Sequence, residues 1–173
     1  MCRKIQKCHE FTDKTCKICE ISVCENEWTP FLIGNEISCL KNFGHMKVID
    51  ATAHCKSLNA NQILPRSGQE SDDLVAALLS LDLDSEDGKT LVSIGIYKSK
   101  EGEWFDSADQ LISYFNWLPG EPDDLSGSKN YAGFRIDGIN ETVRWDEYNG
   151  NDELNIICTK TVSYGKNYGP LLD

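Results

Sequence analysis

Two stretches of the chain place apolar residues at helical spacing, and the first covers residues 50–63. Ala51, Cys55 and Leu58 share one face of this stretch. Asp50, just before them, is a residue type that favours the N-cap position because its carboxylate accepts from the first backbone N–H groups. The pattern therefore predicts a helix over residues 50–63.

The second helical pattern covers residues 71–83. Its apolar stripe consists of Leu74, Leu78 and Leu81. Ser71 or Asp72 would cap it, and acidic residues in the first turn would interact favourably with the positive end of the helix dipole. The pattern predicts a second helix here.

Most of the remaining chain alternates short apolar or β-branched runs with Gly and Asn turns, which is typical of strands. These runs cover residues 37–48, 90–99, 131–138, 142–148 and 155–162. Two helices followed mainly by antiparallel strands indicate an α+β fold.

A long polar stretch at residues 113–130 interrupts the strands and is rich in Pro, Gly, Asp and Ser. Long loops inside compact domains are usually functional or disordered. This one contains Glu121-Pro122-Asp123-Asp124, three carboxylates within four positions, and Lys129 follows. We therefore regard it as the candidate binding segment.

Charge narrows the classes of partner. The 173 residues contain 17 Lys and Arg against 28 Asp and Glu, for a net charge of −11. Phosphate binding needs a basic face, so nucleic acids are not expected as partners, and neither are anionic membrane surfaces. No apolar run approaches the roughly 20 residues that span a bilayer. Clustered carboxylates instead suit hard cations, which take oxygen ligands.

Eight cysteines in a chain of this size favour disulfides and an oxidising compartment. Free buried thiols and a zinc site are the alternatives. Cys16 and Cys19 have ligand-like spacing, but Cys2 and Cys8 are too far apart for the usual zinc pattern. The first residues lack the apolar core of a secretory signal, so the chain is either cytosolic or has lost its signal. The cysteines favour the second interpretation.

Residues 1–23 differ in composition from the rest of the chain. They hold four of the cysteines, many lysines and few large apolar side chains. Such a segment cannot form a core, so disulfides are its natural constraint, and four cysteines allow three pairings. We expect a cysteine-rich N-terminal extension at residues 1–23, a globular domain at 24–160 and a C-terminal tail at 161–173.

From Cys24 to Cys158 the chain resembles a C-type lectin-like domain in its long form. The matching segments, in order, are the Cys24–Cys39 hairpin, AHCKSLNANQI (53–63), Ser93-Ile94-Gly95-Ile96, the run 101–124 with Trp104, Asn116 and Trp117, and RWDEYNGNDELNIIC (144–158). Each motif is weak alone, but their shared order and spacing are specific. The resemblance implies two helices, two small antiparallel sheets and a long calcium-binding loop.

The resemblance also implies how four cysteines pair. Cys24 would bond to Cys39, and Cys55 to Cys158, which ties the first helix to the last strand. The second core disulfide that is usual near the binding loop is missing, because Tyr131 stands at its first position. The loop therefore lacks one covalent constraint.

In the family, calcium (Ca2+) is held by a Glu-Pro-Asn or Gln-Pro-Asp segment, usually with a cis proline, and by Trp-Asn-Asp on a strand. This chain offers Glu121-Pro122-Asp123 and Trp145-Asp146-Glu147. Similarity therefore implies Glu121, Asp123, Asp146 and Glu147 as the calcium ligands. Four converging carboxylates would repel one another, and a divalent ion would convert that repulsion into coordination.

Two departures affect sugar binding. Lys129 stands where mannose-binding members usually have a further glutamate, and it either swings outward or pairs with the loop acids in place of calcium. Asp123 and Asp146 replace asparagines whose amides donate to sugar hydroxyls, and ionised carboxylates only accept. The resemblance implies Glu121, Asp123, Lys129 and Asp146 as the sugar contacts, while Glu-Pro-Asp does not decide the sugar. A second calcium position would involve Asp124 and Glu101.

No pattern supports catalysis, because the three histidines are scattered and none pairs with a nucleophile. Asn140-Glu141-Thr142 is a glycosylation sequon. The leading hypothesis is a secreted, extracellular, calcium-dependent carbohydrate-binding protein, not an enzyme. It would act as a homo-oligomer because single sites bind glycans weakly. The alternatives are a calcium-independent lectin-like domain with a protein or other non-sugar ligand, and a purely structural cysteine-rich module.

Overall fold

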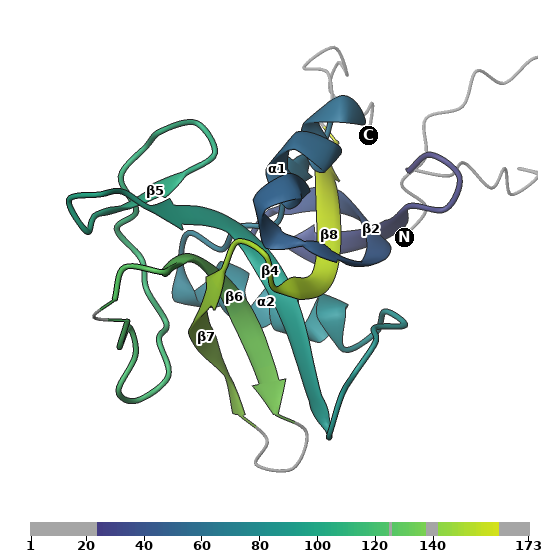
Figure 1. Cartoon of the computed structure of the whole chain (residues 1–173). Helices are drawn as coiled ribbons and strands as arrows, with labels where there is room; N and C mark the ends of the chain where they lie inside the picture. The colour runs from purple at the N-terminus through teal and green to yellow at the C-terminus, as the bar shows by residue number, and fades with distance from the viewer. Residues whose placement is uncertain (1–23, 125, 138–141, 163–173) are drawn as a thin grey trace, which may run out of the picture.

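The computed structural model describes residues 24–124, 126–137 and 142–162 (Figure 1). The described residues form two helices and eight strands. Their bounds are β1 (Thr29–Ile33), β2 (Glu36–Lys47), α1 (Val48–Ser57), β3 (Asn61–Gln62), α2 (Gly68–Leu78), β4 (Lys89–Lys98), β5 (Trp104–Asp106), β6 (Lys129–Asp137), β7 (Thr142–Asn149) and β8 (Glu153–Thr161).

The strands form two antiparallel groups that meet along one short parallel contact. The main path is β1-β2-β8-β4-β6-β7, with β3 added to β8 and β5 added to β4. Only the β4–β8 pair is parallel among these named strands, through Val92 with Asn155 and Ser93 with Ile156. The predicted α+β class is confirmed, and the two expected antiparallel sheets are continuous across this contact. Figure 1 shows β4, β6 and β7 fanning out beside the long loop.

Helix α1 begins at Val48, two residues before the predicted start, and Asp50 lies in its first turn rather than at the N-cap. A tertiary contact supplies the missing cap. The N–H groups of Val48 and Ile49 donate to the backbone carbonyls of Asp152 and Gly150, at 3.0 Å each. The first turn of a helix needs acceptors for its free N–H groups, and here the β7–β8 turn provides them.

The predicted helix 50–63 was also too long at its C-terminal end. Helix α1 ends at Ser57, and Asn59 takes a left-handed conformation with φ of 53°. Residues 61–62 then form β3 and pair with β8. Strand pairing with a segment about one hundred positions away therefore overrides the local helical pattern.

Helix α2 starts earlier than predicted. Ser67, rather than Ser71 or Asp72, is the N-cap, and its hydroxyl accepts from the N–H of Glu70 at 3.2 Å. Ser71 instead lies inside the helix and is buried. The helix ends at Leu78, five residues before the predicted end. The prediction of a helix was therefore right, but both of its ends were placed too far along the chain.

Each helix packs on a different part of the core. Helix α2 contributes Leu74, Ala77 and Leu78 to the larger cluster, which also holds Trp145 and Phe134. Helix α1 contributes Ala51 and Cys55 to a cluster built around the disulfides. The long loop lies against the larger cluster, so the packing of α2, β4, β6 and β7 decides where the loop sits.

The structure forms both disulfides that the resemblance implies. Cys24 bonds to Cys39 and Cys55 bonds to Cys158, with Cα–Cα distances of 5.6 and 5.4 Å. All four cysteines are buried. Cys55 lies on α1 and Cys158 on β8, so this bond fixes the helix to the central strand.

Several sequence expectations lie outside the described residues. These are the extension 1–23 with Cys2, Cys8, Cys16 and Cys19, the Asn140 sequon, and most of the tail after residue 162. Within the described ranges, neither helix has the length and apolar character that crossing a bilayer would require.

Candidate functional site

The long loop runs from the end of β5 to the start of β6 and is attached to strand β7 by backbone hydrogen bonds. The N–H of Trp145 donates to the carbonyl of Asn116, and the N–H of Leu118 donates to the carbonyl of Trp145, both at 2.8 Å. These two bonds place the loop residues that come after Leu118 beside Asp146 and Glu147.

Aromatic packing supports the same attachment. Trp145 is fully buried, and the ring of Trp117 lies 5.6 Å from it, centroid to centroid. The ring of Trp104 lies 5.0 Å from that of Trp117, also centroid to centroid. The tryptophans are therefore packing anchors for the base of the loop rather than exposed platforms for a sugar ring.

Three of the four expected calcium ligands come together. Glu121, Asp123 and Glu147 each offer a carboxylate oxygen, and these oxygens all lie within 4.8 Å of one another. The Glu121–Pro122 peptide is cis. Glu147 is buried, Glu121 is half-buried and Asp123 is exposed, so the cluster opens to solvent on the loop side.

The structure does not bring the Asp146 carboxylate into this cluster. Its Oδ2 accepts from Arg135 at 3.2 Å, and its Oδ1 accepts from the N–H of Glu147 at 2.8 Å. Neighbouring residues on a strand point to opposite faces of the sheet. Asp146 therefore shares a face with Arg135 on β6, while Glu147 turns toward the loop.

Two lysines pair with members of the acid cluster. The Nζ of Lys98 lies 2.7 Å from Oε1 of Glu147, and the Nζ of Lys129 lies 3.3 Å from Oδ1 of Asp123. Of the two alternatives for Lys129, the structure shows pairing with one loop acid, Asp123, through a lysine side chain that is 39% exposed. Lys98 was not identified from sequence, because only the order β4-β6-β7 brings it across β6 to Glu147.

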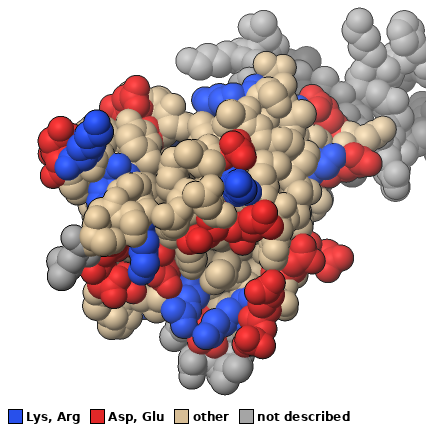
Figure 2. All heavy atoms as spheres, in the orientation of Figure 1, with Lys and Arg blue, Asp and Glu red and all other residues tan. Residues whose placement is uncertain are grey.

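Glu121 has no cationic partner within ion-pair distance among the described residues. Burial, followed by the nearby charges of Asp146 and Asp123, raises the pKa of the Glu121 carboxyl above its ordinary value. The four acids and the cations Lys98, Lys129 and Arg135 together leave one unit of negative charge. The uncompensated charge is concentrated at Glu121 and is the electrostatic feature that would favour a bound cation. Figure 2 shows acidic and basic side chains intermixed in the left part of the view, beside the long loop.

Asp124 serves the loop rather than a second metal position. Its backbone N–H donates to Oε2 of Glu147 at 2.8 Å, while its carboxylate accepts from Ser126 and from the N–H of Lys129. Hydrogen bonds from Ser126 and Lys129 hold the pKa of Asp124 well below its usual range. Glu101, its expected partner in a second calcium position, joins no group of metal-binding acids in the described part of the chain.

A hollow of about 400 Å³ adjoins the acid cluster. Lys98 and Asp124, which both contact Glu147, are among the residues that line it. Its open shape and polar lining suit a hydrophilic ligand that leaves part of its surface in water.

Comparison with known proteins supports the fold through structure and not through sequence. No protein-family model matches the sequence, and no curated protein matches it significantly. Among solved structures, the mouse scavenger receptor C-type lectin carbohydrate-recognition domain matches with a TM-score of 0.63 and 20% identity. The match covers 81% of this chain and 99% of that domain.

Two further neighbours show how varied proteins with this architecture are. The C-type lectin CEL-I from Cucumaria echinata matches with a TM-score of 0.62 and 21% identity, over 81% of this chain and 99% of that one. A calcium-independent type II antifreeze protein matches with a TM-score of 0.59 and 18% identity, over 81% and 95%. The chain therefore has the C-type lectin-like fold, and this fold does not always depend on calcium.

Proposed function

We propose that this protein is a secreted, calcium-dependent carbohydrate-binding protein that recognises glycan hydroxyls at the long loop, and that it is not an enzyme. The observation that carries the proposal is the convergence of Glu121, Asp123 and Glu147 from the loop and from β7. C-type lectins among the structural neighbours support the sugar, and two buried disulfides support an oxidising, extracellular location.

The donor chemistry of the cluster suits calcium. Calcium accepts six to eight oxygen ligands in flexible geometry, and carboxylates are among its preferred ligands. Glu121, Asp123 and Glu147 would hold the ion, and the open side of the cluster leaves room for water and for ligand hydroxyls. When bound, calcium would supply a positive centre that hydroxyl oxygens can coordinate. Asp146 stays with Arg135 and would not be a ligand in this arrangement.

The protein groups around that centre would orient the sugar. Carboxylates of Glu121 and Asp123 accept hydrogen bonds from hydroxyls, and the exposed ammonium of Lys129 donates. Lys129 thus partly replaces the amide donors that Asp123 and Asp146 cannot provide. Because a shallow site of this kind binds one sugar weakly, we propose that several copies of the chain act together.

A second function is favoured by one specific observation. Lys98, Lys129 and Arg135 already compensate three of the four acids. The loop could therefore present the same surface to a protein or another non-sugar ligand with no metal at all. The response of the folded protein to calcium separates the two functions.

Calcium should raise the melting temperature of the purified protein. At a free concentration one hundred times its dissociation constant, an ion that binds only the folded state stabilises that state by about 2.7 kcal/mol. For a domain of this size that corresponds to a rise of roughly 5–10 °C. Scanning calorimetry in calcium, in EDTA and in magnesium measures the effect, with a smaller rise in magnesium because that ion requires stricter geometry. An unchanged melting temperature at millimolar calcium would favour the metal-independent function.

Glycan arrays probed with and without EDTA test the sugar step separately. We expect binding that EDTA abolishes and that Glu121→Gln weakens. The matched control is Glu101→Gln, because Glu101 is an exposed acid outside the cluster. Calcium binding without any glycan signal would support the metal site and contradict the proposed sugar binding.

Calcium affinity should fall as the solution becomes more acidic. The pKa of Glu121 lies above its ordinary value of 4.5, so the carboxyl takes up a proton at a higher pH than a free glutamate does. Protons and calcium compete for the ionised form. Affinity should stay level at high pH, then decline as the pH falls through the raised pKa, by up to about tenfold per unit for one competing proton. Isothermal titration calorimetry between pH 7.5 and roughly pH 5 measures this decline. Asp152→Asn, which changes an exposed acid elsewhere, should leave the profile intact.

A further inference from the structure

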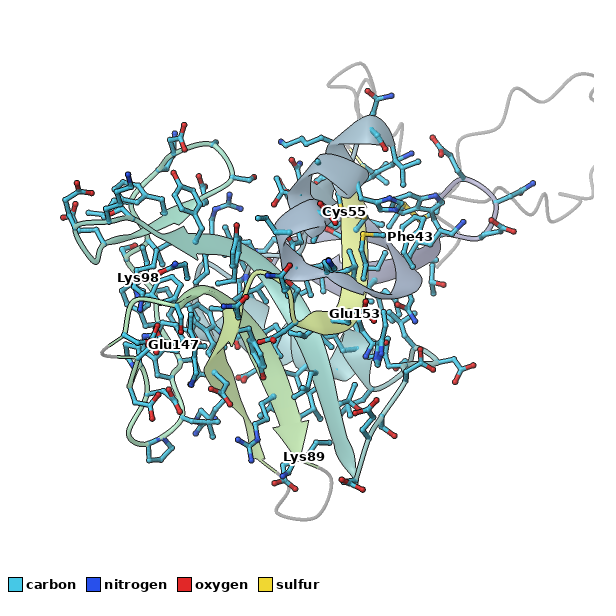
Figure 3. The ribbon with its side chains drawn as sticks, in the orientation of Figure 1. Phe43, Cys55, Lys89, Lys98, Glu147 and Glu153 are labelled. Atoms are coloured by element: carbon cyan, nitrogen blue, oxygen red, sulfur yellow. A yellow bond between two sulfur atoms is a disulfide. The ribbon has the colours of Figure 1, made fainter. Side chains whose placement is uncertain are left out.

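Lys98 occupies an unusual position for a lysine. It is the last residue of β4, and its side chain is only 13% exposed. Its ammonium lies 5.4 Å from the centroid of the Trp104 ring, which further stabilises a cation at this depth. Figure 3 labels Lys98 and Glu147 on the side of the molecule that carries the long loop.

Glu147 is fully buried as a side chain, and each of its carboxylate oxygens has one partner. Oε1 accepts from Lys98 at 2.7 Å, and Oε2 accepts from the backbone N–H of Asp124 at 2.8 Å. One carboxylate therefore links three segments, namely β4, β7 and the middle of the long loop. A buried carboxylate requires a compensating charge, and Lys98 is the cation that supplies it here.

The same carboxylate belongs to the acid cluster of Glu121, Asp123 and Glu147. Lys98 therefore holds the most buried member of the group in which calcium is proposed to bind. An oxygen that accepts from an ammonium at 2.7 Å cannot also coordinate a metal ion at full strength. The lysine and a metal ion are in competition for Oε1 of Glu147.

We propose that Lys98 is an internal, tethered cation that neutralises Glu147 and so keeps the Asp124 segment of the loop folded without metal. It acts on the loop through Glu147 and is a positioning residue. One consequence of this proposal rests on the proposed function. It is that Lys98 lowers calcium affinity by competing with the ion for the Glu147 carboxylate. Lysine suits this role because its flexible stem allows the ammonium to move away from a carboxylate that gains another partner.

Amide hydrogen exchange in EDTA, with neither calcium nor sugar present, tests the positioning role. In the wild-type protein we expect the Asp124 amide to be protected. Lys98→Met removes the charge while keeping a similar length, and should accelerate exchange of that amide at least tenfold. Lys100→Met, which changes an exposed lysine two residues away, should change it less than twofold.

The double variant Lys98→Met/Glu147→Gln separates charge from packing. An uncharged glutamine side chain in place of Glu147 needs no cation but still offers an oxygen to the Asp124 N–H, so protection should return to within about threefold of wild type. If Lys98→Met fails to fold in EDTA, recovery of the fold in this double variant supports the proposal equally. Fast exchange in the double variant, or unchanged exchange in Lys98→Met, would overturn it.

Calcium titration of Lys98→Met tests the competition. We expect the dissociation constant to fall at least tenfold relative to wild type, with no such change in Lys100→Met. An equal or weaker affinity would show that Lys98 does not compete with calcium. The positioning role in the metal-free protein is tested separately by the exchange data. Neither measurement uses a glycan, so absence of sugar binding would reject the proposed function without affecting this inference.

Discussion

Replacing Cys55 and Cys158 together by alanine is expected to lower the free energy of unfolding by about 4–5 kcal/mol. The two residues are 103 positions apart, and a bond that closes so long a segment removes much of the entropy of the unfolded chain. Both cysteines are fully buried between α1 and β8, so the loss of packing adds to the effect. The melting temperature should fall by roughly 10–20 °C.

The second disulfide is the matched control. Cys24 and Cys39 are 15 positions apart, and the same chain-entropy argument gives about 3 kcal/mol for the double alanine variant. Urea denaturation of both variants measures the difference. An equal loss, or a larger loss at the shorter loop, would show that strain or residual structure outweighs loop closure at these positions.

Trp145→Ala is expected to destabilise the protein by about 3–5 kcal/mol, the usual cost of removing a buried tryptophan side chain. Trp145 has no exposed surface, and rings of the long loop and of β6 surround it. Its backbone also carries the two hydrogen bonds that attach the loop to β7. We therefore expect faster hydrogen exchange at the Leu118 amide together with the lower melting temperature.

Phe115→Ala tests whether any ring at the base of the loop would give the same result. Phe115 contacts both Trp117 and Trp145, but it is 41% exposed. Partial exposure limits the apolar surface it buries, so we expect a loss of about 1 kcal/mol or less. A Trp145→Ala variant as stable as Phe115→Ala would mean that the loop attachment does not depend on this core contact.

Sequence pattern was sufficient for the type of each major element. The apolar stripes identified both helices, and the alternating runs identified the strands that became β4, β6, β7 and β8. Resemblance to the C-type lectin-like domain added the order of the elements and the pairing of four cysteines. The helix and strand types are encoded locally in side-chain periodicity, so they are readable without coordinates. The cysteine pairing joins residues up to 103 positions apart and came only from the resemblance.

Helix ends were less predictable because tertiary contacts set them. Residues 50–63 carry a helical pattern throughout, but a distant turn caps the helix at Val48 and pairing with β8 ends it at Ser57. Ser67 caps the second helix in place of Ser71 and Asp72, the two residues that the sequence pattern suggested. Local propensity differs by only a few tenths of a kcal/mol among such choices, and tertiary packing outweighs it.

The amino-acid sequence was enough to establish an acidic α+β domain with a loop rich in carboxylates, because composition and periodicity act along the chain. Only the tertiary structure decided which acids meet. Strand alternation separated Asp146 from Glu147, and the order β4-β6-β7 brought Lys98 to the buried carboxylate. Electrostatic partners are chosen by distance in space, so residues 49 positions apart neutralise one another here while adjacent residues point to opposite faces.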